Sequence, residues 1–499
     1  MLRDEVLGRE ELKKRVEPFI YSKLKESKYT VRQQVAHELL TWDRLDLAFK
    51  LFYLDNIDLC STLAKRVYHD DIRSQTLGAF VEFGNENEKN CFESYIEHFS
   101  FTYASIEKYG FLKERSLIPL SCDGGILNGA HRVASAIRLN MVVSTIQTEK
   151  VPMVADYRYF HDRDVCVSHM DLIVQKFIQY SKDNVYIAFL WPSGVGHKNE
   201  VESMFSQIIY KKEMKLTSTG AFNLLVELYK HMDWAGSCEN SFSGVKKKLL
   251  ECFPELTPFQ VILFQSESIG AVRKLKEKVR SVYDIGFSSV HITDTQEEAM
   301  RVSQLICNEN GLHFLNNASP YKFMRTYMQL DKFKLFLSEN NIAFNDVVID
   351  GSSTLSLYGF RESVDVDFLA LNFPEATCAS KCFEAHDSEL EYHHKTKLEL
   401  IYDSSNYFWF YGLKFIGFAQ LYLMKVNRDE EKDRNDCQLM KASIDGFSHR
   451  KVLAKFRQRI FYTKLRLNYF FAKKIKSSLE MVGLYDIVRT AFRKITNRQ

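Results

Sequence analysis

The chain has 499 residues, of which 45% are hydrophobic and 26% charged, with only 8 Pro and 21 Gly. This composition excludes a disordered or fibrous protein, and the length predicts about two to four domains. The sequence has no apolar run of the roughly 18 residues needed to cross a bilayer, and its charged beginning is unlike a signal peptide. Ten cysteines without a CxxC pair are typical of reduced thiols. We therefore expect a cytoplasmic multidomain protein.

The first half of the chain predicts two kinds of structure. Residues 1–84 place apolar side chains at helical spacing and contain few helix breakers, which predicts an α-helical lead-in. In residues 85–182, short apolar runs alternate with helical segments around a glycine-rich loop, which predicts a small α/β module.

Two further α/β units follow. Residues 183–318 predict a middle domain of unknown role, with strands at 185–190, 259–266 and 288–293. Residues 319–446 begin with a helical pattern, continue into the strand DVVID and then turn at a glycine. The predicted fold class is thus α/β multidomain, with a mixed sheet in the last unit.

Positive charge is concentrated in the segment 447–499, which carries 14 Lys and Arg against two acids, a net charge of +12. The whole chain carries +3, so residues 1–446 carry −9. This segment predicts a basic amphipathic helix, which suits either an anionic membrane surface or packing on the protein itself. Nucleic acid is not the expected partner, because the rest of the chain repels phosphate. The apolar positions are Val452, Leu453, Phe456, Ile460, Leu467, Phe471 and Ile475.

The segment VVIDGSSTLSLYGFRESVDVDFLAL carries the strongest chemical pattern. A strand ends before Gly351 and Ser352, and a second strand presents Asp365 and Asp367 on one face, because strand side chains alternate. Two such carboxylates can hold Mg²⁺, while the glycine turn and the serine can bind a triphosphate. The alternative is an ordinary strand whose acids face solvent.

These residues resemble the nucleotidyltransferase superfamily, whose pattern is a strand, Gly-Ser, a spacer and Asp-x-Asp. The resemblance implies that Gly351, Ser352 and Arg361 bind nucleotide and that Asp365 and Asp367 bind Mg²⁺ and catalyse. It also implies a third carboxylate on a later strand, for which KLELIYD offers Glu399, our choice, or Asp403. In the helical segment that follows, the resemblance implies nucleotide contact by Lys425, with Lys432, Asp433 and Asp436 nearby.

A second glycine loop lies in SLIPLSCDGGILNGAHRVASAIRLN, between a predicted strand and a predicted helix. Its glycines let backbone N–H groups converge, and an arginine at the helix start can bind phosphate oxygens. The segment resembles the ParB/sulfiredoxin-like superfamily, some members of which are ATP-dependent kinases of small hydroxyl compounds. The alternative is a structural turn. The resemblance implies a nucleotide site formed by Asp123, Gly124, Asn128, Gly129, His131 and Arg132.

Cys378, Cys382, His393 and His394 lie close together in sequence, but their spacing matches no established zinc site. We interpret them as buried thiols and loop histidines.

Together the two resemblances imply a bifunctional phosphotransferase, a kinase plus a nucleotidyltransferase. It would use Mg²⁺ and ATP or another nucleoside triphosphate on a small hydroxyl or phosphate acceptor. The expected product is a nucleotide-activated precursor for bacterial surface polysaccharide biosynthesis, made in the cytoplasm or at the inner face of the membrane. The alternatives are a toxin-like nucleotidyltransferase that modifies protein or RNA, and a non-catalytic nucleotide-sensing scaffold at the membrane.

Overall fold

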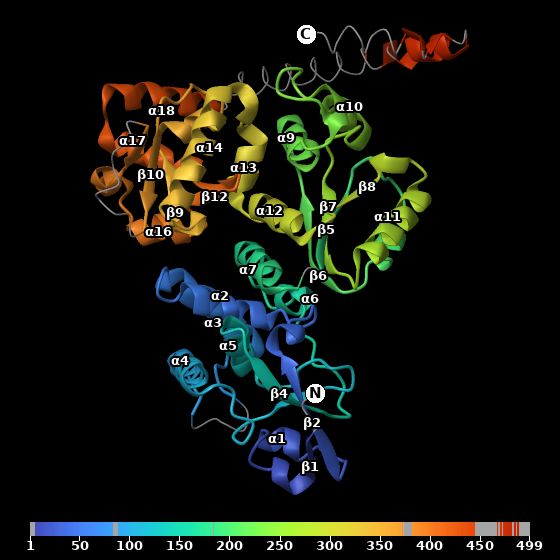
Figure 1. The fold of residues 1–499 in the computed structure, drawn as a ribbon, viewed down its shortest axis with the longest axis vertical. Helices are drawn as coiled ribbons and strands as arrows, with labels where there is room; N and C mark the ends of the chain where they lie inside the picture. The colour runs from blue at the N-terminus through green and yellow to red at the C-terminus, as the bar shows by residue number, and fades with distance from the viewer. Residues whose placement is uncertain are drawn as a thin grey trace.

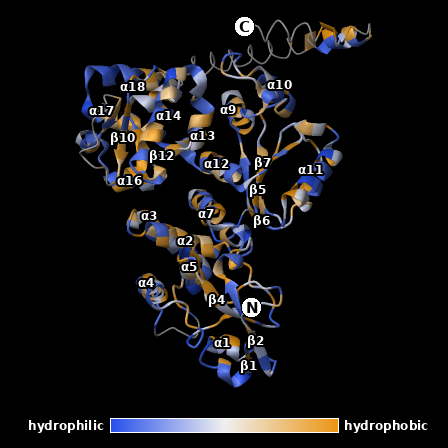
Figure 2. Ribbon diagram, viewed as in Figure 1, coloured by the Kyte–Doolittle hydropathy of each residue, from blue (hydrophilic) through white to orange (hydrophobic). Residues whose placement is uncertain are grey.

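The computed structural model describes residues 5–82, 88–182, 184–371, 373 and 382–444, and parts of the C-terminal segment between 467 and 488. The described chain is a mixed α/β protein with three separate sheets, which follow one another along the sequence (Figure 1). One continuous hydrophobic cluster extends from Ala36 to Met440 and so links helices and strands from all three regions. Figure 2 shows apolar residues concentrated on interior strands such as β5 and β7.

The first sheet corrects the expected helical lead-in. Residues 5–35 contribute two of its four strands, because Tyr29 and Val31 alternate with polar residues and are buried in a small core of their own. Strand β2 pairs antiparallel with β1 and β4, and β4 pairs parallel with β3. The strands, in sheet order, are β1 (Glu5–Gly8), β2 (Lys28–Val35), β4 (Val142–Gln147) and β3 (Ile118–Leu120).

The helical part of the lead-in prediction is confirmed beyond residue 45. Helix α2 packs against three other helices, α3, α5 and α7, and is buried along most of its length. The main helices of this region are α2 (Asp46–Asn56), α3 (Ser61–Gln75), α4 (Phe92–Tyr109), α5 (Ala130–Arg138) and α7 (Val167–Tyr180).

The middle sheet is antiparallel throughout, in the order β6-β7-β5-β8. The three predicted strands are confirmed, whereas the edge strand β6 was not predicted, because Lys211, Lys212 and Glu213 interrupt its apolar pattern. The strands are β5 (Val185–Leu190), β6 (Ile208–Met214), β7 (Phe259–Gln265) and β8 (Val290–Ile292). The main helices are α9 (Ser218–Tyr229), α10 (Ser243–Cys252), α11 (Ile269–Tyr283), α12 (Gln296–Ile306) and α13 (Glu309–Asn317).

The third sheet is mixed, as predicted, with the order β11-β10-β9-β13-β12. Strand β9 pairs antiparallel with β10 and parallel with β13. The strands are β9 (Val347–Asp350), β10 (Val366–Ala370), β11 (Phe383–Ala385), β12 (Tyr407–Phe410) and β13 (Leu413–Ile416). The helices are α14 (Met324–Glu339), α15 (Ser352–Leu357), α16 (Lys397–Tyr402), α17 (Phe418–Arg428) and α18 (Glu431–Ile444).

The described part of the C-terminal segment is mainly helical. Its predicted apolar positions Leu467, Phe471 and Ile475 are all more than half exposed, and the predicted positions 452, 453, 456 and 460 lie outside the described residues. Among the described residues, no helix combines the length and apolar character that crossing a membrane requires.

Candidate active site

The turn between β9 and α15 is shaped around a carboxylate. Gly351 has a φ of +65°, and a Cβ atom at this position would lie 2.3 Å from Oδ2 of Asp367. Only glycine fits both the backbone conformation and this close approach. The predicted strand, glycine turn and short helix are therefore present, and the space that glycine leaves is filled by the Asp367 side chain.

Asp367 lies in a row of three acids across neighbouring strands. It pairs directly with Asp350 of β9 on one side and with Glu384 of β11 on the other. Residues that pair directly across strands point to the same face of a sheet. Asp365 immediately precedes β10, and the Ser352 hydroxyl donates to its carboxylate at 3.3 Å. The structure thus brings the predicted Ser352, Asp365 and Asp367 together and adds two acids.

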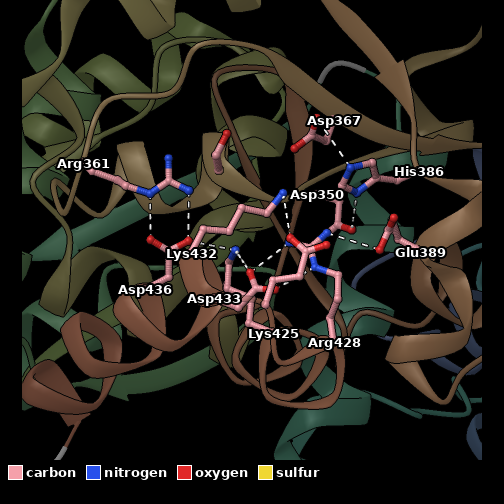
Figure 3. A network of polar contacts seen from close by, with 12 residues as sticks. Asp350, Arg361, Asp367, His386, Glu389, Lys425, Arg428, Lys432, Asp433 and Asp436 are labelled. Carbon is pink, nitrogen blue, oxygen red and sulfur yellow. Dashed lines mark hydrogen bonds and ion pairs between the residues drawn. The ribbon is translucent and has the colours of Figure 1, made fainter.

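Two histidines support this row, and Figure 3 shows one of them, His386, between Asp350 and Asp367. Asp350 is fully buried, and its Oδ2 lies 3.2 Å from Nδ1 of His386 and 3.0 Å from Nε2 of His393. The other ring nitrogen of His386 lies 3.6 Å from Oδ1 of Asp367. His393 also accepts a contact from the amide of Gln420, so its ring is held on both sides. His386 therefore bridges the buried acid and the candidate catalytic acid.

The pKa values of Asp350 and Asp367 shift in opposite directions. Although burial alone would raise it, hydrogen bonds from His386 and His393 hold the pKa of Asp350 well below its usual value. Burial raises the pKa of Asp367 to about 6; Asp365, Asp350 and Glu384 add to this effect, and the charge of His386 opposes it. Asp350 is thus held in its ionised form, whereas Asp367 lies among negatively charged neighbours.

The donor set suits a hard divalent cation. Carboxylate oxygens are the ligands that Mg²⁺ prefers, and a cation would favour the ionised form of Asp367, whose pKa burial and the neighbouring acids raise. The carboxylate oxygens of Asp365, Asp367 and Glu384 do not all lie within 4.8 Å of one another. The one group of three potential donors within 4.8 Å of one another, among the described residues, lies elsewhere and consists of Asp70, Cys166 and His169.

The prediction that the third carboxylate, Glu399, lies on a strand is wrong. Residues 397–402 form helix α16 rather than a strand, because Thr396 and Glu399 make a capping box at its start. The Glu399 carboxylate accepts from the Thr396 N–H and hydroxyl, both at 2.8 Å, and the alternative Asp403 accepts from the Ser405 N–H. Glu384, on a strand of only three residues, takes the place next to Asp367, and so short a strand gave no detectable signal in the sequence.

The predicted basic residues form a closed ion network rather than a free phosphate contact (Figure 3). Lys425 is 2% exposed, and its ammonium lies 2.9 Å from both Asp433 and Asp436. Arg361 donates two hydrogen bonds to Asp436, at 2.7 and 2.9 Å. Lys432 pairs with Glu430 at the surface instead. The network joins α17 and α18 to the loop after α15, and Lys425 is not available to a phosphate.

No protein-family model, curated protein or solved structure matches this chain. The chemistry of the site is therefore inferred from its own residues.

The residues of the second predicted site line two separate hollows. Asn128, Gly129, His131 and Arg132 line a cavity of about 310 Å³ beside α5, together with Lys89 and His98. Gly129 has a φ of +91°, and a Cβ there would lie 2.7 Å from the Arg132 guanidinium. Asp123 and Gly124 instead line a separate hollow of about 610 Å³. The three residues between Gly124 and Asn128 carry the chain from one hollow to the other.

Arg132 and His131, two polar residues of the smaller cavity, already have protein partners. Arg132 pairs with Glu17, and Nε2 of His131 lies 2.8 Å from the Tyr68 hydroxyl. Burial, with the charge of Lys50 adding to it, holds the pKa of His131 well below its usual value. His131 is therefore neutral near pH 7, and Arg132 is the predicted residue that offers positive charge to an anion there.

Proposed function

We propose that residues 319–446 transfer a nucleotidyl group from a nucleoside triphosphate to a small phosphate or hydroxyl acceptor. The observations that carry this proposal are the direct pairing of Asp367 with Glu384 on neighbouring strands and the hydrogen bond from Ser352 to Asp365 at the Gly351–Ser352 turn. Acids next to a turn with a hydroxyl-bearing residue suit a reaction that moves charge on phosphate oxygens.

Asp365, Asp367 and Glu384 would hold Mg²⁺, which when bound supplies positive charge to the phosphates. Ser352 is placed to orient a phosphate oxygen, since its hydroxyl lies at the same turn. The acceptor oxygen forms a new bond to the α-phosphorus, the bond to the β-phosphate breaks, and pyrophosphate leaves. Although burial alone would lower it, the hydrogen bond of His386 to Asp350 raises the pKa of this histidine, and its charged form beside Asp367 would favour the ionised carboxylate.

The test is pyrophosphate release from a panel of nucleoside triphosphates with Mg²⁺ and candidate sugar, polyol and phosphorylated acceptors. We expect Asp365→Asn to reduce release at least 100-fold while its circular dichroism and melting temperature stay those of the wild type. Asp331→Asn, which changes an acid of α14 that accepts a hydrogen bond from the Tyr411 hydroxyl, serves as the matched control. Full activity of the Asp365 variant would refute the assignment.

The cavity beside α5 supports a second, phosphate-binding step. We propose that it binds ATP for phosphorylation of a small hydroxyl compound, so that the chain makes a nucleotide-activated precursor in two reactions, of the kind used for surface polysaccharide. Arg132→Gln should weaken ATP binding in calorimetry about tenfold, whereas Arg66→Gln, an exposed change on α3, should not. Equal ATP affinity in both variants would remove this step.

The same assays separate the other candidate activities. Mass shifts on a co-incubated protein or tRNA, without turnover of small acceptors, would identify a macromolecule-modifying enzyme. Binding of triphosphate with neither ADP nor pyrophosphate release would identify a non-catalytic sensor.

A further inference from the structure

A third hollow lies where the three regions of the molecule meet. Its volume is about 590 Å³, within the range of roughly 300 to 1,000 Å³ that is usual for small-molecule sites. Helix α12 of the middle region packs against both α7 and β12, and the three elements come together in Figure 1. The residues of this junction cavity used below are Asp55, Arg138, Lys176, Trp409 and Lys414.

Positive charge dominates the lining of the junction cavity. Arg138, Lys176 and Lys414 are its cationic side chains, and Asp55 is its one carboxylate among the described lining residues. Asp55 accepts from Arg138 at 2.7 Å and from Lys176 at 2.6 Å, so one negative charge is shared by two cations. One carboxylate of the lining thus faces three cations.

Lys414 is the most enclosed of these cations. It lies on β13 at 1% exposure, and its ammonium donates to the backbone carbonyls of Asn345 and Ile401, at 2.6 and 2.7 Å. Aromatic rings surround it, with the centroids of Tyr407 and Trp409 at 4.6 and 5.4 Å. Burial lowers the pKa of Lys414 to about 7; Asp346 opposes this effect and Lys176 adds to it. A buried ammonium held by neutral groups gains from an anion beside it.

We propose that the junction cavity binds a small phosphate-bearing molecule, with its anionic group near Lys176 and Lys414 and Trp409 as one wall. A group with two negative charges matches the cations better than a single carboxylate does. The site is distinct from the acids of the candidate active site, because Trp409 and Lys414 pair with each other at the opposite edge of the sheet from β11. A ligand there would hold the three regions together.

The probe is inorganic pyrophosphate, titrated into the full-length chain in EDTA, so that neither magnesium-dependent binding nor catalysis contributes. We expect calorimetric binding that weakens at least tenfold in Lys414→Met and in Lys176→Gln. Lys334→Met is the matched control, since Lys334 also lies against an aromatic ring, that of Tyr411, but outside the cavity. Arg132→Gln separates this site from the cavity beside α5 and should leave the binding unchanged.

Tryptophan fluorescence locates the bound anion. We expect pyrophosphate to change the emission of the wild type and not that of Trp409→Phe. If Lys414→Met fails to fold, as judged by its melting curve, the less buried Lys176→Gln carries the test. No binding to the wild type, unchanged affinity in the cavity variants, or a loss confined to Arg132→Gln would each overturn the proposal. The result does not depend on nucleotidyl transfer, because no turnover is measured.

Discussion

At the scale of single residues, the candidate site is organised around Asp367. Its carboxylate fills the space above Gly351, faces His386 and lies between two other acids. Crowding of like charges at low exposure costs stability, and it is a feature of sites that bind cations. Under the proposed function, the cluster trades stability of the free protein for affinity towards a divalent ion.

This trade predicts that Asp367→Asn stabilises the metal-free protein. The folded pKa of about 6 exceeds the usual value of 3.8, so the stability cost of ionising Asp367 develops as the pH rises from about 4 to about 6 and is complete above that. We expect the variant to gain about 2 kcal/mol in free energy of unfolding at pH 8 and to show no gain near pH 4. Urea denaturation in EDTA at both pH values measures this difference in free energy of unfolding. A less stable variant at pH 8 would contradict the prediction.

At the scale of elements, the turn between β9 and α15 depends on its glycine. Gly351→Ala requires a positive φ and places a methyl group in the position of the Asp367 carboxylate. We expect the free energy of unfolding to fall by about 2 kcal/mol. We also expect pyrophosphate release to be lost. Gly270→Ala is the control, because the nearest atom to its new Cβ is 3.7 Å away. Wild-type behaviour of the Gly351 variant would show that the turn tolerates a side chain.

The pairing of α17 with α18 depends on a buried cation. Lys425→Met leaves Asp433 and Asp436, which are 0% and 2% exposed, short of one positive charge. Loss of one partner from a buried pair costs about 3 kcal/mol, whereas an exposed pair contributes about 0.5 kcal/mol or less. Lys432→Met, at the surface, should therefore leave the denaturation midpoint almost unchanged. Equal midpoints for the two variants would mean that the network is not structural.

At the scale of the whole molecule, charge is divided between a body of −9 and a C-terminal segment of +12. Most of the described apolar side chains of that segment, including Phe471, Ile475 and Met481, are exposed. We propose that this segment binds the anionic face of a membrane, with its cations at lipid phosphates and its apolar residues in the interface.

Removal of residues 447–499 should abolish co-sedimentation with vesicles that contain phosphatidylglycerol, while pyrophosphate release in solution persists. Binding of the full chain should weaken as salt rises, because the attraction between exposed charges is screened. Vesicles of phosphatidylcholine are the control. Retention of the truncated chain on the anionic vesicles would place the membrane contact elsewhere or exclude it.

Local patterns in the sequence were enough for the mixed α/β class, most of the middle strands and the turn at Gly351 with its two following acids. Each of these follows from residues within one segment, where alternation or helical spacing and a glycine act directly on the backbone. The same local reasoning failed for Lys28–Val35 and Lys397–Tyr402. The first forms a strand because β4 lies beside it, and the second forms a helix that a capping box begins.

Tertiary structure alone decided which residues meet. Asp350, Glu384 and His386 join Asp367 through strand pairing and a turn, and Lys425 loses its expected role because two acids of α18 neutralise it. The junction cavity requires three regions that are distant in sequence. Charge balance and burial depend on such long-range neighbours, whereas the sequence by itself determines only the local geometry that each residue brings to them.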